Sequence, residues 1–332
     1  MRDQYNKQEL QEFKPAFGLA NKHIQTLYPV LFRKKIQLKF ETERFWLDDG
    51  DFVDCFWYGK PERSHKTPIV ILFHGLEGSY RSSYIQGMMN TLGKAGFSSV
   101  LMHFRGCSGK MNNLPRSYHS GDTNDAKAWI THLDNHYNGH KLFAVGYSLG
   151  GNMLLKLLGE WKEESPLAGA VSVSAPMQLE ASADRMNRGV SLIYQYYLMK
   201  HLKASLLKKY KSHPMESIIG IDENSVKKLK TLREFDDAYT APVNGFESAN
   251  EYYKKSSAKQ FVKNIRTSTL IIHALDDPFM TNKVLPDQKE LPLSVKMELS
   301  KNGGHVGFVG GNIFRPKYWL EERILAFIKK LN

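Results

Sequence analysis

Short apolar runs alternate with amphipathic stretches along most of the chain. The first clear run covers residues 68–73, which read Pro-Ile-Val-Ile-Leu-Phe. Continuous apolar runs of this length are typical of strands buried on both faces of a parallel sheet. The same pattern predicts strands at 97–103, 141–147, 168–174, 268–274 and 295–299, and helices at 84–95, 123–135, 149–160 and 318–331. Strands that alternate with helices of this length predict βαβ units and a mostly parallel central sheet with flanking helices.

An antiparallel hairpin is expected ahead of this alternation. Residues 43–47 and 52–58 are rich in aromatic and β-branched residues, and Asp48-Asp49-Gly50 separates them. An Asp-Gly pair between two such runs is a strong signal for a tight turn.

The alternation stops between residues 177 and 262, where the sequence is helix-like and rich in Tyr, Leu, Met and Lys. A helical insertion after the sixth strand would form a cap over the strand ends. Because open α/β sheets bind ligands outside the carboxyl ends of their strands, such a cap would roof the site. We therefore expect a core in two parts, 1–176 with an N-terminal extension and 263–332, with a helical cap at 177–262.

Composition narrows the class of protein only moderately. The chain has 332 residues, of which 42% are hydrophobic and 24% are charged, as in ordinary globular domains. The start is polar without the apolar core of a signal peptide, and no run of about 18 apolar residues predicts a spanning helix. Two cysteines, Cys55 and Cys107, argue against a disulfide scaffold, so we expect a cytoplasmic protein.

The net charge of +12 leaves more than one kind of partner open. No zinc-finger spacing or RNA-binding aromatic motif accompanies the charge, so nucleic-acid binding is not expected. The basic residues concentrate in 185–215, a segment with no acid, around the apolar stretch Val190–Met199. We favour a cap helix with an apolar inner face and solvated lysines; weak contact with an anionic lipid surface is the alternative.

Gly146-Tyr147-Ser148-Leu149-Gly150 matches the pattern G-x-S-x-G between a predicted strand and a predicted helix. This is the context of the nucleophile elbow of α/β-hydrolases, where a strained turn exposes a serine hydroxyl above the sheet. Glycines are needed because a side chain at Gly146 or Gly150 would clash with neighbouring backbone. Ser148 is therefore the candidate nucleophile.

The partners of such a serine follow it in the order acid, then histidine. Two adjacent carboxylates, Asp276 and Asp277, end a predicted strand just before Pro278, which cannot continue the ladder. We favour Asp277, which directly precedes the proline, and keep Asp276 as the alternative. His305 lies between the last strand and the last helix, among glycines that let the loop bring an imidazole back to the serine.

A tetrahedral oxyanion needs two backbone donors. One should be the N–H of Leu149, the residue after the nucleophile, and the other should come from the loop after the third strand. That loop reads His74-Gly-Leu-Glu-Gly78, so we predict the N–H of Leu76. His74 is expected to orient this loop.

No cofactor or metal is expected. His132, His136 and His140 have four-residue spacing, but no Glu-x-x-His pattern or cysteine accompanies them. The glycine-rich run 303–311 does not read G-x-G-x-x-G and does not follow a strand as a phosphate-binding turn would.

These motifs together resemble the YheT-like branch of the α/β-hydrolase superfamily, over nearly the whole chain. The matching segments are 13–15, 21–26, 48–52, 74–79, 105–109, 118–121, 146–152, 276–279 and 303–308. The resemblance implies an α/β-hydrolase fold, carboxylic-ester hydrolysis, and Ser148, Asp277 and His305 as the catalytic triad. Arg105 and His119 also belong to the family's motifs; we expect them to brace the sheet end, with substrate contact as the alternative.

The sequence thus predicts a serine hydrolase that cleaves carboxylic esters through an acyl-serine intermediate. Because the cap is rich in Leu, Tyr and Met, the expected partner is a small-molecule or lipid-like ester with an apolar acyl chain. An acyltransferase with the same triad and a catalytically silent binding protein of the same fold stay as alternatives. Amide or thioester cleavage, and the oligomeric state, are not decided by any residue.

Overall fold

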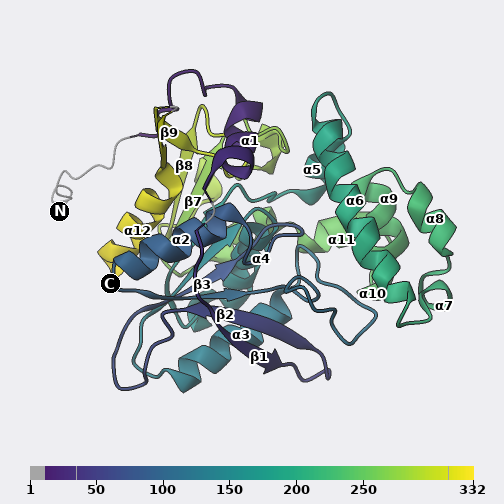
Figure 1. Cartoon of the computed structure of the whole chain (residues 1–332), viewed down its shortest axis with the longest axis horizontal. Coiled ribbons are helices and arrows are strands. Elements are labelled where there is room, and N and C mark those ends of the chain that lie inside the picture. The colour runs from purple at the N-terminus through teal and green to yellow at the C-terminus, as the bar shows by residue number, and fades with distance from the viewer. Residues whose placement is uncertain (1–11, 35, 313) are drawn as a thin grey trace.

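The structure is a computed structural model that describes residues 12–34, 36–312 and 314–332 (Figure 1). Residues 1–11, most of the polar start, lie outside the described residues. The rest forms a layered core with a helical insertion projecting from one side, as Figure 1 shows.

Within the described residues, eight strands form one sheet in the order β1-β2-β4-β3-β5-β6-β7-β8. The first two form the predicted antiparallel hairpin around Asp48-Asp49-Gly50, and β2 also pairs antiparallel with β4. All other neighbours are parallel, which confirms the expected sheet. The strands are β1 (Glu41–Trp46), β2 (Phe52–Tyr58), β3 (Ile69–Phe73), β4 (Ser98–Met102), β5 (Leu142–Tyr147), β6 (Leu167–Val173), β7 (Thr269–Ala274) and β8 (Val295–Ser300).

Helices cover both faces of this sheet, as the continuous apolar strands require. On one face α2 (Ser83–Lys94) and α12 (Trp319–Leu331) bury Met88, Leu92 and Ile324 against the strands. On the other face α3 (Thr123–His136) and α4 (Leu149–Trp161) bury side chains such as Trp129 and Leu154. Both layers are cores of buried aliphatic and aromatic side chains, and such burial is the main stabilising contribution in folding.

The insertion between β6 and β7 is helical, as the sequence predicts. It has a small core of its own, in which Met199, Leu202 and Leu206 pack against Phe235 and Tyr239. Its α-helices are α5 (Leu179–Met186), α6 (Ser191–Tyr210), α7 (Met215–Ile219), α8 (Glu223–Lys228), α9 (Leu232–Phe235), α10 (Ala241–Val243) and α11 (Ala249–Ser256). A π-helical turn (Asp236–Thr240) follows α9, and a 3-10 segment (Ala258–Asn264) leads back to the core.

The sequence did not predict one helix and one hairpin that the structure contains. Helix α1 (Lys22–Phe32) begins at Asn21, whose side chain accepts hydrogen bonds from the amides of His23 and Ile24. It was not predicted because Pro29 lies inside it and because its pattern is inverted: polar Gln25 and Thr26 are buried, whereas its aliphatic residues are exposed. A hairpin of β9 (Val309–Asn312) and β10 (Arg315–Tyr318) precedes α12, in a stretch whose glycines hide the strand pattern.

Candidate active site

Ser148 lies at the sharp turn between β5 and α4. Its φ of 50° is in the left-handed region, which is strained for a non-glycine residue. A Cβ on Gly146 would lie 2.4 Å from the carbonyl oxygen of Gly150, and one on Gly150 would lie 2.6 Å from that of His74. The backbone therefore approaches itself so closely that both positions require glycine. The turn places the serine hydroxyl at the amino end of α4, where the helix dipole favours developing negative charge.

The imidazole of His305 reaches this hydroxyl from the far end of the chain. Its Nε2 lies 3.0 Å from Ser148 Oγ, and its Nδ1 lies 2.8 Å from a carboxylate oxygen of Asp277. Positive φ angles at Gly303, Gly304 and Val306 give the loop after β8 the path that brings the ring there. The structure thus joins the three predicted residues in one hydrogen-bonded series.

The two adjacent carboxylates have different partners. Asp277 is buried and contacts the imidazole, and its other oxygen accepts a hydrogen bond from the amide of Phe279. Asp276 instead accepts hydrogen bonds from the Gly304 amide and the Asn302 side chain. Burial raises the pKa of Asp276. By geometry, Asp277 is the carboxylate that can fix the imidazole tautomer, while Asp276 holds the loop that carries His305.

The predicted backbone donors, Leu76 and Leu149, both line the same cavity as Ser148. The neighbouring amides in the first loop are engaged, because Gly75 donates to the Tyr84 hydroxyl and Glu77 to the Tyr118 hydroxyl. Among the residues that the structure describes, the amides of Leu76 and Leu149 donate to no protein acceptor. Two unpaired N–H groups beside a nucleophile are the arrangement that an oxyanion hole needs.

His74 lies behind this loop and does not face the cavity. Its Nδ1 is 2.7 Å from the carbonyl oxygen of Gly75, and its Nε2 accepts a hydrogen bond from the Phe104 amide. Burial lowers the pKa of His74 to about 3, so the ring is neutral and its Nδ1–H donates to Gly75. The ring therefore fixes the path of the loop from which the Leu76 amide comes.

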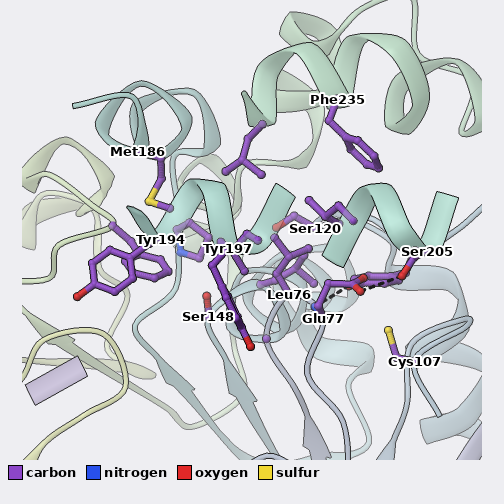
Figure 2. A pocket seen from close by; sticks show the side chains of 18 of the residues that line it. Leu76, Glu77, Cys107, Ser120, Ser148, Met186, Tyr194, Tyr197, Ser205 and Phe235 are labelled. Carbon is purple, nitrogen blue, oxygen red and sulfur yellow. Dashed lines mark hydrogen bonds between the residues drawn. The ribbon is translucent and has the colours of Figure 1, made fainter. Parts of the chain in front are cut away.

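A cavity of about 1020 Å³ separates the strand ends from the insertion. Figure 2 shows Ser148 and Leu76 on its floor and Met186, Tyr194, Tyr197 and Phe235 contributed by the helices above. Most of its lining is aliphatic or aromatic. Glu77 is an exception, and its carboxylate accepts hydrogen bonds from the hydroxyls of Tyr118 and Ser205.

Three contacts that the sequence did not reveal support the imidazole. The ring of Phe279 stacks on that of His305 with centroids 4.1 Å apart and an interplanar angle of 8°. The hydroxyl of Thr26, on α1, accepts a hydrogen bond from the His305 amide, and Ser174 accepts one from the Val306 amide. The only available signal was the presence of Thr26 and Phe279 within the resembling segments, which does not indicate what they contact.

Arg105 and His119 lie near the end of the sheet. Arg105 is buried and forms ion pairs with Asp49, Asp51 and Asp125, which join the hairpin turn to α3. His119 accepts a hydrogen bond from the Gly121 amide, and burial lowers its pKa to about 3.

The histidines with four-residue spacing have ordinary partners. His136 contacts Arg63, and His140 donates from Nδ1 to the Thr67 carbonyl. No group of three or more potential metal ligands occurs in the described part of the chain. Within the same residues, no helix is both long and apolar enough to cross a membrane.

The fold and this site define the α/β-hydrolase class, and comparison with known proteins agrees. The family described as alpha/beta hydrolase fold matches residues 68–311. The esterase Pf2001 of Pyrococcus furiosus superposes with a TM-score of 0.55 over 88% of this chain and 93% of its own, at 15% identity, which shows the shared fold alone.

Curated relatives narrow the class. "Putative esterase YheT" of Escherichia coli (strain K12) is 44% identical over 94% of this chain and 92% of its own length. A monoacylglycerol lipase of Saccharomyces cerevisiae (strain ATCC 204508 / S288c) is 31% identical over 90% of this chain and 68% of its own length. The chain belongs to the YheT-like esterase family of the α/β-hydrolase superfamily, related to esterases, lipases and phospholipases.

Proposed function

We propose that the chain is a serine esterase in which Ser148 is the nucleophile, His305 the general base and Asp277 the acid that orients the imidazole. One observation carries this proposal: a hydroxyl, an imidazole and a buried carboxylate are joined by hydrogen bonds of 3.0 and 2.8 Å at the floor of an apolar cavity. A serine with this arrangement is activated for attack on an acyl carbonyl.

The proposed reaction has two halves. Ser148 Oγ attacks the ester carbonyl while His305 Nε2 takes its proton, and the imidazolium then donates that proton to the departing alcohol. Water attacks the resulting acyl-serine with the same histidine as base, which releases the carboxylic acid. The amides of Leu76 and Leu149 would stabilise both tetrahedral oxyanions, and each such donor contributes about 3 kcal/mol.

The cavity supports an ester with an apolar acyl chain. Its volume of about 1020 Å³ is at the upper end of ordinary ligand pockets. Leu179, Met186, Leu202 and Phe235 line it from the insertion, so a bound chain would contact mainly aliphatic and aromatic surface. The name of the yeast relative, a monoacylglycerol lipase, fits such a substrate. We further propose that residues 177–262 act as a cap domain over the core segments 1–176 and 263–332. The acyl chain of the substrate would bind between the cap domain and this core.

A panel of chromogenic acyl esters of increasing chain length tests this function. We expect kcat/KM to rise with each added methylene by up to about fourfold, since burying a methylene contributes about 0.8 kcal/mol. The rise should stop when the chain fills the cavity. Equal turnover of acetyl and long-chain esters would contradict the substrate class. Transfer of the acyl group to an added alcohol in preference to water would assign an acyltransferase instead.

A further inference from the structure

Two helices beside the cavity mouth expose apolar side chains that the core does not use. These side chains, between 40% and 74% exposed, form what we call the apolar rim. On α1 they are Ile24, Leu27, Val30, Leu31 and Phe32. On α6 they are Leu192, Ile193, Tyr196 and Tyr197, which follow one another at helical spacing along one stripe. Helix α6 therefore has an apolar outer stripe over its first two turns, in addition to the apolar inner face that the sequence predicts.

The two halves of the rim belong to one surface. His23 of α1 and Tyr194 of α6 join the helices, because the imidazole Nδ1 lies 3.1 Å from the tyrosine hydroxyl and the two rings stack. In Figure 1, α1 and helix α6 of the insertion both reach the upper side of the view. The members closest to the site, among them Val30, Ile193 and Tyr197, also line the cavity. The rim is thus continuous with the cavity that contains Ser148.

Basic residues flank both stripes. Lys22 and Lys34 bracket α1, and Arg188 and Lys200 bracket the stripe on α6. Residues 13–40 and 185–215 contain no Asp or Glu. Two acids next to these helices have basic partners: Asp184 pairs with Arg233, and Glu321 pairs with Arg33 at the end of α1. An apolar face bordered by cations is complementary to a surface with negative headgroups over an apolar interior.

We propose that the apolar rim seats the cavity mouth on an anionic lipid surface, from which an apolar ester passes directly to Ser148. The delivery of substrate rests on the proposed esterase function, whereas the docking itself does not. A lipid surface fits better than a protein partner because the inner rim residues line the cavity and a protein seated on them would close its mouth. Tyrosines such as Tyr196 suit such a boundary, since the ring is apolar and the hydroxyl stays in water.

Flotation with phospholipid vesicles tests the docking. The vesicles are phosphatidylcholine alone, or one part phosphatidylglycerol to two parts phosphatidylcholine. We expect the unsubstituted protein to bind the anionic vesicles at least about tenfold more tightly than the neutral ones. The double variant Leu192→Ser/Tyr196→Ser, which changes exposed residues outside the cavity lining, should weaken that binding by about tenfold or more.

Charge reversal tests the electrostatic half. Arg188→Glu/Lys200→Glu should reduce binding to the anionic vesicles by about tenfold or more, since each basic residue near such a surface contributes about 1 kcal/mol. Two matched controls lie near the amino ends of the strands, whereas the cavity lies at their carboxyl ends. Leu293→Ser precedes β8 and removes a fully exposed leucine, and Lys329→Glu/Lys330→Glu reverses two exposed charges at the end of α12. Both controls should bind as the unsubstituted protein does.

Hydrolysis separates docking from catalysis. A short, soluble ester should be cleaved equally well by Leu192→Ser/Tyr196→Ser, whereas a long-chain ester carried in the anionic vesicles should be cleaved about tenfold more slowly. Ser148→Ala should cleave neither ester yet bind vesicles normally. If the unsubstituted protein binds vesicles but cleaves no ester, the proposed function fails and the docking stands. Failure to bind anionic vesicles, or a dimer that the rim variant dissociates, would overturn the docking proposal.

Discussion

At the scale of single residues, two adjacent aspartates have different partners although they are neighbours in the chain. Asp276 and Asp277 differ by one position at the end of β7, yet only Asp277 contacts the imidazole of His305. The sequence favours Asp277 because of Pro278, and the geometry supports the same choice. The stacked Phe279 was out of reach of such reasoning, since its contact with His305 depends on the path of two loops far apart in the chain.

Amide substitutions separate the two carboxylates. Asp277→Asn should lower kcat about 10⁴-fold, because an amide in this position favours the wrong imidazole tautomer. Asp276→Asn should stay within about tenfold of the unsubstituted enzyme, since an amide oxygen can still accept the Gly304 hydrogen bond. The measurement is kcat for one soluble ester with both variants. An inactive Asp276→Asn beside an active Asp277→Asn would reverse the assignment.

At the scale of elements, the helical insertion contains an acid whose ionisation is linked to folding. Asp236 begins the π-helical turn after α9, lines the cavity and accepts a hydrogen bond of 2.7 Å from the Tyr253 hydroxyl. Burial raises its pKa from 3.8 to about 6. The folded state therefore binds this proton more tightly than the unfolded state. The stability that results is complete below the unfolded pKa and is lost as the pH rises through about 6.

Asp236→Asn should remove this dependence and keep an acceptor for Tyr253. The free energy of unfolding of the variant, relative to the unsubstituted protein, should rise by up to about 3 kcal/mol between about pH 4 and pH 7. Urea denaturation of both proteins at a series of pH values measures the difference. A difference that does not change with pH would show that the carboxyl group has the same pKa folded and unfolded.

The same scale shows where sequence patterns succeed. The core strands were predictable because most of them are runs of mainly apolar residues, which indicates burial on both faces. Ile69–Phe73 is an example, since all five of its residues are buried. Helix α1 was not predictable, because Pro29 and an exposed apolar side break the usual pattern. The exposed apolar side chains of α1 are part of the apolar rim. The same side chains that prevented the prediction of this helix are therefore the ones that we propose to contact lipid. The β9–β10 hairpin was hidden by Gly310 and Gly311, which carry no strand signal.

At the scale of the whole molecule, the core contributes Ser148 and His305 to the cavity, and the helices of the insertion line the same cavity from the other side. Helix α6 connects the insertion to the core. Its amino-terminal turns form part of the rim, and near its carboxyl end the buried Lys209 donates hydrogen bonds to the Asn112 side chain and to the carbonyls of Leu114 and Arg116. The desolvation of Lys209 lowers its pKa to about 8, so this contact holds a mainly charged amine at neutral pH. The hydrogen bonds of Lys209 hold α6 against the core loop that contains Asn112. They therefore fix the position of α6 relative to β5, β7 and the loop after β8.

The most direct test of the account is covalent labelling of the nucleophile. A fluorophosphonate reacts with an activated serine and should attach once per chain, on the peptide that carries Ser148, with loss of ester hydrolysis in proportion. Ser148→Ala should neither label nor hydrolyse, with kcat reduced by about 10⁴-fold or more. His305→Ala should label far more slowly. Attachment at another residue, or ester hydrolysis that persists in Ser148→Ala, would contradict the central claim.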